Sequence, residues 1–70
     1  METLQQASRR YTERSFEAFL EGRPNCTENW LRGVVGASSQ EDIQEALESL
    51  ALNYGDSERF GVLRRACEVA

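Results

Sequence analysis

Histidine and lysine are both absent from this chain of 70 residues, and so is any long apolar run. Without histidine the chain lacks the commonest general base and the commonest metal ligand. No stretch approaches the ~18 consecutive apolar residues that a membrane span needs, and the first residues hold no hydrophobic signal core. We therefore expect no membrane association and a cytoplasmic location.

Cysteine is scarce. The chain has only Cys26 and Cys67, which are too far apart in sequence to form a metal-binding motif. In a chain without a secretory signal, two reduced thiols are the favoured state, although a disulfide would be an effective staple for so small a core. The chain also lacks a glycine-rich phosphate loop and a nucleophile elbow. We therefore expect no cofactor, no metal and no enzymatic activity.

The length bounds the fold. Seventy residues predict a single domain over residues 1–70, in which only ~60% of the surface of the unfolded chain can be buried. Apolar residues make up 40% of the chain, and their regular spacing is typical of a folded protein rather than a disordered one. Stability should total about 3–10 kcal/mol.

The clearest helix lies between Ser38 and Gly55. Its apolar residues recur at three- and four-residue spacing, as one face of a helix requires; they are Ile43, Ala46, Leu47, Leu50, Ala51 and Tyr54. Ser38 and Glu41 are spaced to form a capping box, and Gly55 is placed to end the helix in a left-handed conformation.

The remaining segments are also helical in pattern. Residues 2–21 should form a long helix with an inward stripe of Leu4, Ala7, Tyr11, Ser15 and Ala18, widened by Phe16, Phe19 and Leu20. Thr27 should cap a short helix that ends at Gly36 and turns Trp30, Leu31, Val34 and Val35 inward. Trp30 is expected at the centre of the core, and the alternative is an exposed interface anchor. A fourth helix, capped by Asp56 or Ser57, should run to about Val69, with Gly61 held against another backbone.

No segment alternates as a half-buried strand would. The sequence therefore predicts an all-α fold, a small compact bundle of three long helices plus one short helix. The apolar arc of the fourth helix is wider than one neighbour needs and includes Val62, Ala66 and Val69. A chain this short gains from burying such a surplus in a symmetric contact, so we expect a homodimer.

All eight basic residues are arginines, and the net charge is −4. Arg9, Arg10 and Arg14 lie on the first helix, and Arg59, Arg64 and Arg65 on the last. They would form one basic patch if the two helices were adjacent; otherwise they belong to salt-bridged, solvated faces. The order of a short helix, a glycine and a second helix over residues 31–50 also has the outline of a helix-turn-helix.

The charge of that second helix argues against direct nucleic-acid binding. From Gly33 through Glu58 the chain has six acids and no base, and carboxylates facing phosphates repel them. A helix-turn-helix-like nucleic-acid binder is therefore the third of three hypotheses, behind two that use the acidic charge.

Those two hypotheses rest on Glu41, Glu45, Glu48 and Leu52, which share one helical face. Either another helix covers Leu52, or Leu52 is an apolar contact bordered by charge. The second interpretation predicts a protein-binding module, an adaptor, regulator or inhibitor whose partner carries a basic surface. In the alternative, the acidic face imitates nucleic acid, as in small inhibitors encoded by phages or mobile elements.

Overall fold

A computed structural model describes residues 1–69, which form four α-helices and no strand. The helices are α1 (Leu4–Leu20), α2 (Glu28–Ala37), α3 (Gln40–Tyr54) and α4 (Glu58–Val69). The predicted all-α bundle is thereby confirmed, with α2 as its short helix. None of the described helices is both long enough and apolar enough to span a bilayer.

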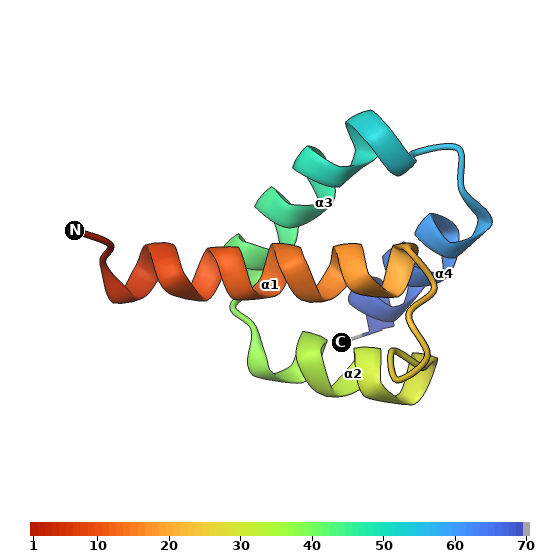
Figure 1. The fold of residues 1–70 in the computed structure, drawn as a ribbon, viewed down its shortest axis with the longest axis horizontal. Coiled ribbons are helices and arrows are strands. Elements are labelled where there is room, and N and C mark those ends of the chain that lie inside the picture. The colour runs from red at the N-terminus through yellow and green to blue at the C-terminus, as the bar shows by residue number, and fades with distance from the viewer. Residues whose placement is uncertain (70) are drawn as a thin grey trace.

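The longest helix, α1, organises the arrangement (Figure 1). In this view α3 lies above α1, α2 lies below it, and α4 packs behind its C-terminal half. The first turns of α1 extend beyond the other three helices. The N-terminal part of α1 therefore has fewer neighbours than the rest of the bundle.

The core lies where all four helices meet. Phe16 of α1, Leu31 of α2 and Leu63 of α4 are fully buried at its centre. The other buried apolar residues are Phe19, Leu20, Val34, Val35, Ile43, Ala46, Leu50, Phe60 and Cys67. Trp30 is only half-buried and packs at the edge of this core, so its expected central place is wrong.

The predicted inward stripe of α1 is wrong in its first half. Leu4 is 91% exposed and Tyr11 is 58% exposed. The side chains turned inward near the middle of α1 are polar, because Thr12 is buried in place of Tyr11 and Ser15 is buried as predicted. Thr12 Oγ1 lies 3.1 Å from Ser8 O and 3.0 Å from Ser38 Oγ, so its one hydroxyl proton can be donated to either acceptor. The contact with Ser38 links the buried side of α1 to the end of α2.

The cap of α3 lies one residue later than expected. Ser39, not Ser38, is the N-cap, and its Oγ accepts from Asp42 N at 3.2 Å. Ser38 is occupied elsewhere, because its Oγ donates to Val34 O at 2.8 Å and so helps to end α2. Thr27 caps α2 as predicted, accepting from Trp30 N at 3.1 Å.

Two expectations about glycine are also wrong. Gly55 is right-handed, with φ −55°, and the described glycine with a left-handed backbone is Gly22, with φ +77°. Gly55 is needed for another reason, because a Cβ there would lie 2.6 Å from Ala51 O. At Gly61 a Cβ would meet no atom within 4 Å, so no backbone packs closely against it.

Candidate protein-binding surfaces

The predicted face of α3 is exposed along its whole length. Glu41, Glu45, Glu48 and Leu52 succeed one another at intervals of four, three and four residues, opposite the core residues Ile43 and Leu50. We call these four residues the acidic surface. Leu52 is 87% exposed, so the interpretation in which another helix covers it is wrong. No helix within the described residues covers the Leu52 side chain.

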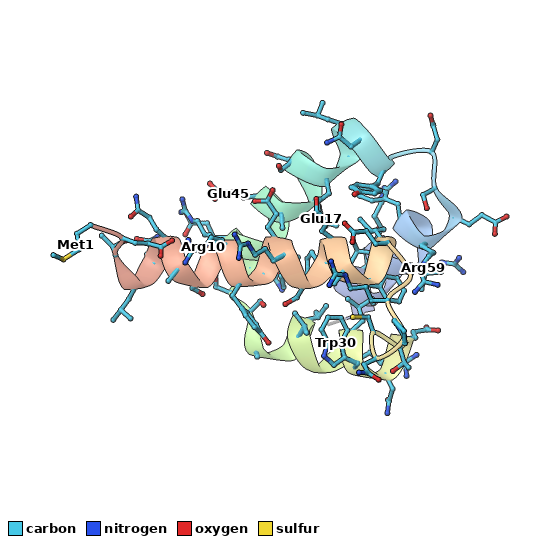
Figure 2. The ribbon with its side chains drawn as sticks, in the orientation of Figure 1. Met1, Arg10, Glu17, Trp30, Glu45 and Arg59 are labelled. Carbon is cyan, nitrogen blue, oxygen red and sulfur yellow. The ribbon has the colours of Figure 1, made fainter. Side chains whose placement is uncertain are left out.

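An arginine from α1 reaches the first half of the acidic surface. Arg9 Nε lies 3.2 Å from Asp42 Oδ1 and 3.0 Å from Glu45 Oε2, while Arg9 Nη2 lies 3.4 Å from Glu41 Oε1. Glu45 projects from α3 toward solvent above α1 in Figure 2. Arg9 thus offsets part of the charge that the sequence leaves unopposed. Glu48 enters no ion pair with any residue up to Glu68.

Asp42 anchors this arrangement below the surface. It is 5% exposed, and its Oδ2 accepts from Ser8 Oγ at 3.0 Å while its Oδ1 accepts from Arg9 Nε. A second contact between α1 and α3 lies two turns further on, where Ser49 Oγ donates to Glu13 Oε1 at 3.0 Å. Polar groups therefore hold α3 on α1. Through Arg9, Glu41 and Glu45 contribute to the contact between α1 and α3, and they also make the surface of α3 negative.

A second surface, which the sequence interpretation missed, runs along the free side of α1. An open groove of about 380 Å³ lies there, lined by Ala7, Arg10, Tyr11, Arg14, Ser15, Ala18 and Trp30. We call it the α1 groove. Figure 2 shows Trp30 on α2, below α1, where it forms one wall. The apolar spacing of α1 was visible in the sequence, but not that its N-terminal part stays uncovered.

The arginines do not gather in one basic patch. Arg10 and Arg59 lie toward opposite ends of α1 in Figure 2. Arg59 Nε donates to Phe19 O at 2.6 Å, and its guanidinium lies 4.3 Å from the centre of the Phe19 ring. Arg9 is bound to α3, and Arg10 pairs with Glu2 at 2.7 Å. Several arginines are thus committed to contacts within the chain.

The surplus apolar arc expected on α4 is smaller than the sequence suggests. Val62 and Ala66 are partly buried and pack against the core. The side chain of Val69 lies outside the described residues. The part of α4 that can be assessed thus offers little apolar surface for a second copy.

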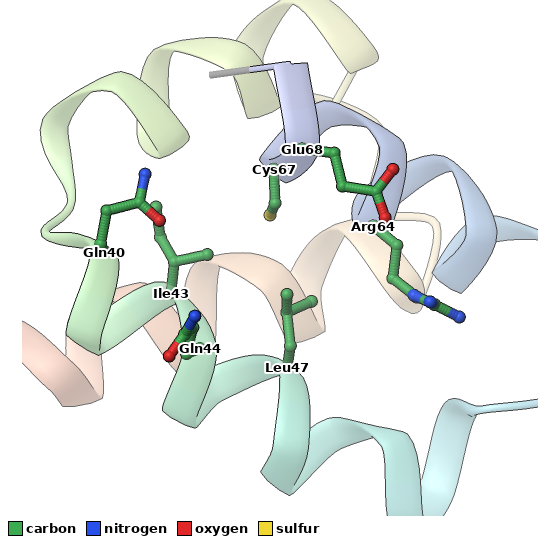
Figure 3. A pocket seen from close by; sticks show the side chains of 7 residues that line it. All are labelled: Gln40, Ile43, Gln44, Leu47, Arg64, Cys67 and Glu68. Atoms are coloured by element: carbon green, nitrogen blue, oxygen red, sulfur yellow. The ribbon is translucent and has the colours of Figure 1, made fainter.

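A second hollow lies between α3 and α4 (Figure 3). It has a volume of about 410 Å³, and its lining is mostly polar or charged, with Gln40, Gln44, Arg64 and Glu68 around Cys67. Both cysteines are free thiols. Burial, and then the Glu68 carboxylate, raise the pKa of Cys67 to about 11, so its thiol stays protonated at neutral pH. Within the described residues, no three acidic or cysteine side chains are arranged to hold a metal.

The two thiols should therefore react at different rates. At pH 7.5 we expect a thiol reagent to modify half-buried Cys26 at least ~10-fold faster than buried Cys67, because the thiolate is the reactive form. The pKa of Cys67 rises on folding from 9.0 to about 11, so its contribution to stability is complete below pH 9 and is lost as the pH rises through 11. Labelling the Cys26→Ser and Cys67→Ser variants separately measures both rates; equal rates would contradict the burial of Cys67.

Comparison with known proteins provides no relative from which to transfer a function. No protein family, curated protein or solved structure matches the chain.

Proposed function

We propose that this chain is a small, non-enzymatic protein-binding module that acts in the cytoplasm as an adaptor, regulator or inhibitor. It binds its partner through the C-terminal half of the acidic surface, with Leu52 as the apolar contact. The observation that supports the proposal is the 87% exposure of Leu52 beside carboxylates of the same face. The partner that complements this surface has an apolar pocket for Leu52, bordered by basic residues.

The expected energetics of such a contact are favourable. Full burial of one leucine side chain contributes about 1.5–3 kcal/mol, and contacts of this kind dominate binding when a polar rim excludes water. Among the described residues Glu48 has no ion-pair partner, so its charge is available to attract a basic partner and to speed association. Glu45 shares Arg9 with Asp42 and Glu41 and therefore contributes less net charge.

The same arrangement weighs against the two nucleic-acid hypotheses. A mimic of nucleic acid needs a strong, uncompensated negative field, whereas Arg9 offsets the charge of the first turns of α3. In a helix-turn-helix role, those turns would present Glu41 and Glu45 to phosphates, which repel carboxylates. Salt dependence separates the alternatives, since binding by a mimic weakens steeply with ionic strength and binding centred on Leu52 does not.

The test compares single variants on one captured partner. Tagged wild-type protein is used to isolate partners from its own host, and affinity is then measured with the purified partner. We expect Leu52→Ser to weaken binding at least ~10-fold, as loss of a central apolar contact does. Glu48→Arg should slow association, most of all at low salt. Glu48 is a better target than Glu45, because reversal of Glu45 would also disturb Arg9.

The controls are Leu4→Ser, a second leucine that is 91% exposed, and Glu58→Arg, a second exposed acid. Both should bind as the wild type does. All four variants should keep their helicity, since exposed substitutions change stability by no more than ~0.5 kcal/mol. Unchanged affinity in both Leu52→Ser and Glu48→Arg would refute the proposal.

A further inference from the structure

The side of α1 that faces away from α3 carries an apolar stripe that α2 borders along one edge, where Trp30 lies. Leu4, Ala7, Tyr11 and Ala18 lie along it at multiples of three and four residues, with Arg14 between the last two. Leu4 and Tyr11 are mostly exposed, and the small side chains of Ala7 and Ala18 leave the α1 groove open. Such spacing is typical of the seam between two long helices.

The charges beside this stripe change sign along the helix. Arg10 and Arg14 lie in its N-terminal half, while Glu17 and Glu21 lie at its C-terminal end. Arg14, Glu17 and Glu21 line one continuous hollow beside the α1 groove, together with Ala18 and Arg23. In an antiparallel contact, the basic half of one helix lies beside the acidic half of the other. A second copy of α1 carries this charge pattern.

We infer that α1 forms an antiparallel homodimer through this face. When Ala7 lies opposite Ala18 of the second copy, the two helices approach closely at both ends. Arg10 then lies beside Glu17 of the second copy, and the contact occurs twice by symmetry. Arg14 also meets Tyr11 of the second copy, a pairing that a cation and an aromatic ring favour. A parallel arrangement would instead place Arg10 beside Arg10.

The size of the contact sets its strength. Seventeen residues of helix span about 26 Å, and one such face is smaller than the ~800 Å² per partner of a standard interface. We therefore expect a weak dimer that forms at high-micromolar concentration. The exposed Arg10–Glu2 pair would be exchanged for Arg10–Glu17 across the interface, at little cost because surface ion pairs contribute ~0–1 kcal/mol.

Sedimentation equilibrium over a range of protein concentrations tests the inference. The wild-type mass should rise from 7.9 kDa toward twice that value. Arg10→Glu places two acids together at each contact, and Glu17→Arg places two bases together. Each single variant should weaken self-association at least ~10-fold, since like charges across an interface are strongly unfavourable.

Two recombinations identify the pairing. An equimolar mixture of Arg10→Glu and Glu17→Arg should form a heterodimer, because both contacts are then of opposite charge. The double variant Arg10→Glu/Glu17→Arg should self-associate again. Arg65→Glu, an exposed change of the same charge on α4, serves as the control and should associate as the wild type does.

A wild-type chain that stays at 7.9 kDa throughout would overturn the inference, as would single variants that dimerise normally or a mixture that stays monomeric. A persistent dimer that loses stability only on Arg65→Glu would place the interface on α4. The inference does not depend on the proposed function, because it uses no residue of the acidic surface. Leu52→Ser should self-associate normally whether or not it binds another protein.

Discussion

Replacement of Phe16 by alanine is expected to leave the protein largely unfolded at 25 °C. Phe16 has no exposed surface and lies where α1 meets the other helices. Truncation of a buried phenylalanine costs about 3–5 kcal/mol, which is comparable with the ~3–10 kcal/mol total expected for a chain of this size. Circular dichroism at 222 nm during urea unfolding measures the loss, and helicity in the absence of urea should already be reduced.

Tyr11→Ala is the matched control, because it removes an aromatic ring from the same helix. Tyr11 is 58% exposed, so we expect its loss to cost less than ~1 kcal/mol. The comparison tests the rotation of α1 directly. If Tyr11→Ala destabilised the protein as much as Phe16→Ala, the inward face of α1 would be the one that carries Leu4 and Tyr11, and the described orientation of this helix would be incorrect.

The contrast between Phe16 and Tyr11 also shows which parts of the fold could be predicted from the sequence and which could not. Apolar periodicity predicted the helices and most of the core. Ile43 and Leu50 on α3, and Leu63 on α4, each belong to a series of apolar residues at helical spacing. It could not orient the first half of α1, because the polar residue Thr12 is buried there while Leu4 and Tyr11 are exposed. Hydrophobic spacing carries no information about a polar inward face, and the uncovered stripe of α1 was therefore assigned to the core.

The candidate site, too, could be predicted only in part from the sequence. Spacing alone placed Glu41, Glu45, Glu48 and Leu52 on one face of α3. It could not bring Arg9 to that face, because Arg9 and Asp42 are 33 residues apart and meet only after α1 and α3 have packed. A long-range polar contact of this kind depends on the tertiary arrangement, so local sequence rules do not predict it.

That contact gives the second large effect, since Asp42→Ala is expected to destabilise the protein by about 2–3 kcal/mol. The substitution removes two hydrogen bonds to a buried carboxylate, and a hydrogen bond to a charged group typically contributes about 1.5–3 kcal/mol. Here Ser8 Oγ and Arg9 Nε would lose an acceptor that is itself 5% exposed. Asp42→Asn should cost less, because its amide oxygen can still accept from Ser8. Thermal unfolding of both variants gives the comparison.

Glu41→Ala is the control for Asp42→Ala, because Glu41 lies in the same turn and faces the same arginine but is exposed. We expect it to cost no more than ~0.5–1 kcal/mol, as for an exposed ion pair. A double-mutant cycle of Arg9→Ala and Asp42→Ala then isolates their coupling, which should exceed ~1 kcal/mol for a partly buried charged contact. Coupling near zero, with Asp42→Ala no worse than Glu41→Ala, would mean that Arg9 does not hold α3 on α1. The acidic surface would then be less neutralised than its geometry indicates, and Glu45 would become as good a target for reversal as Glu48.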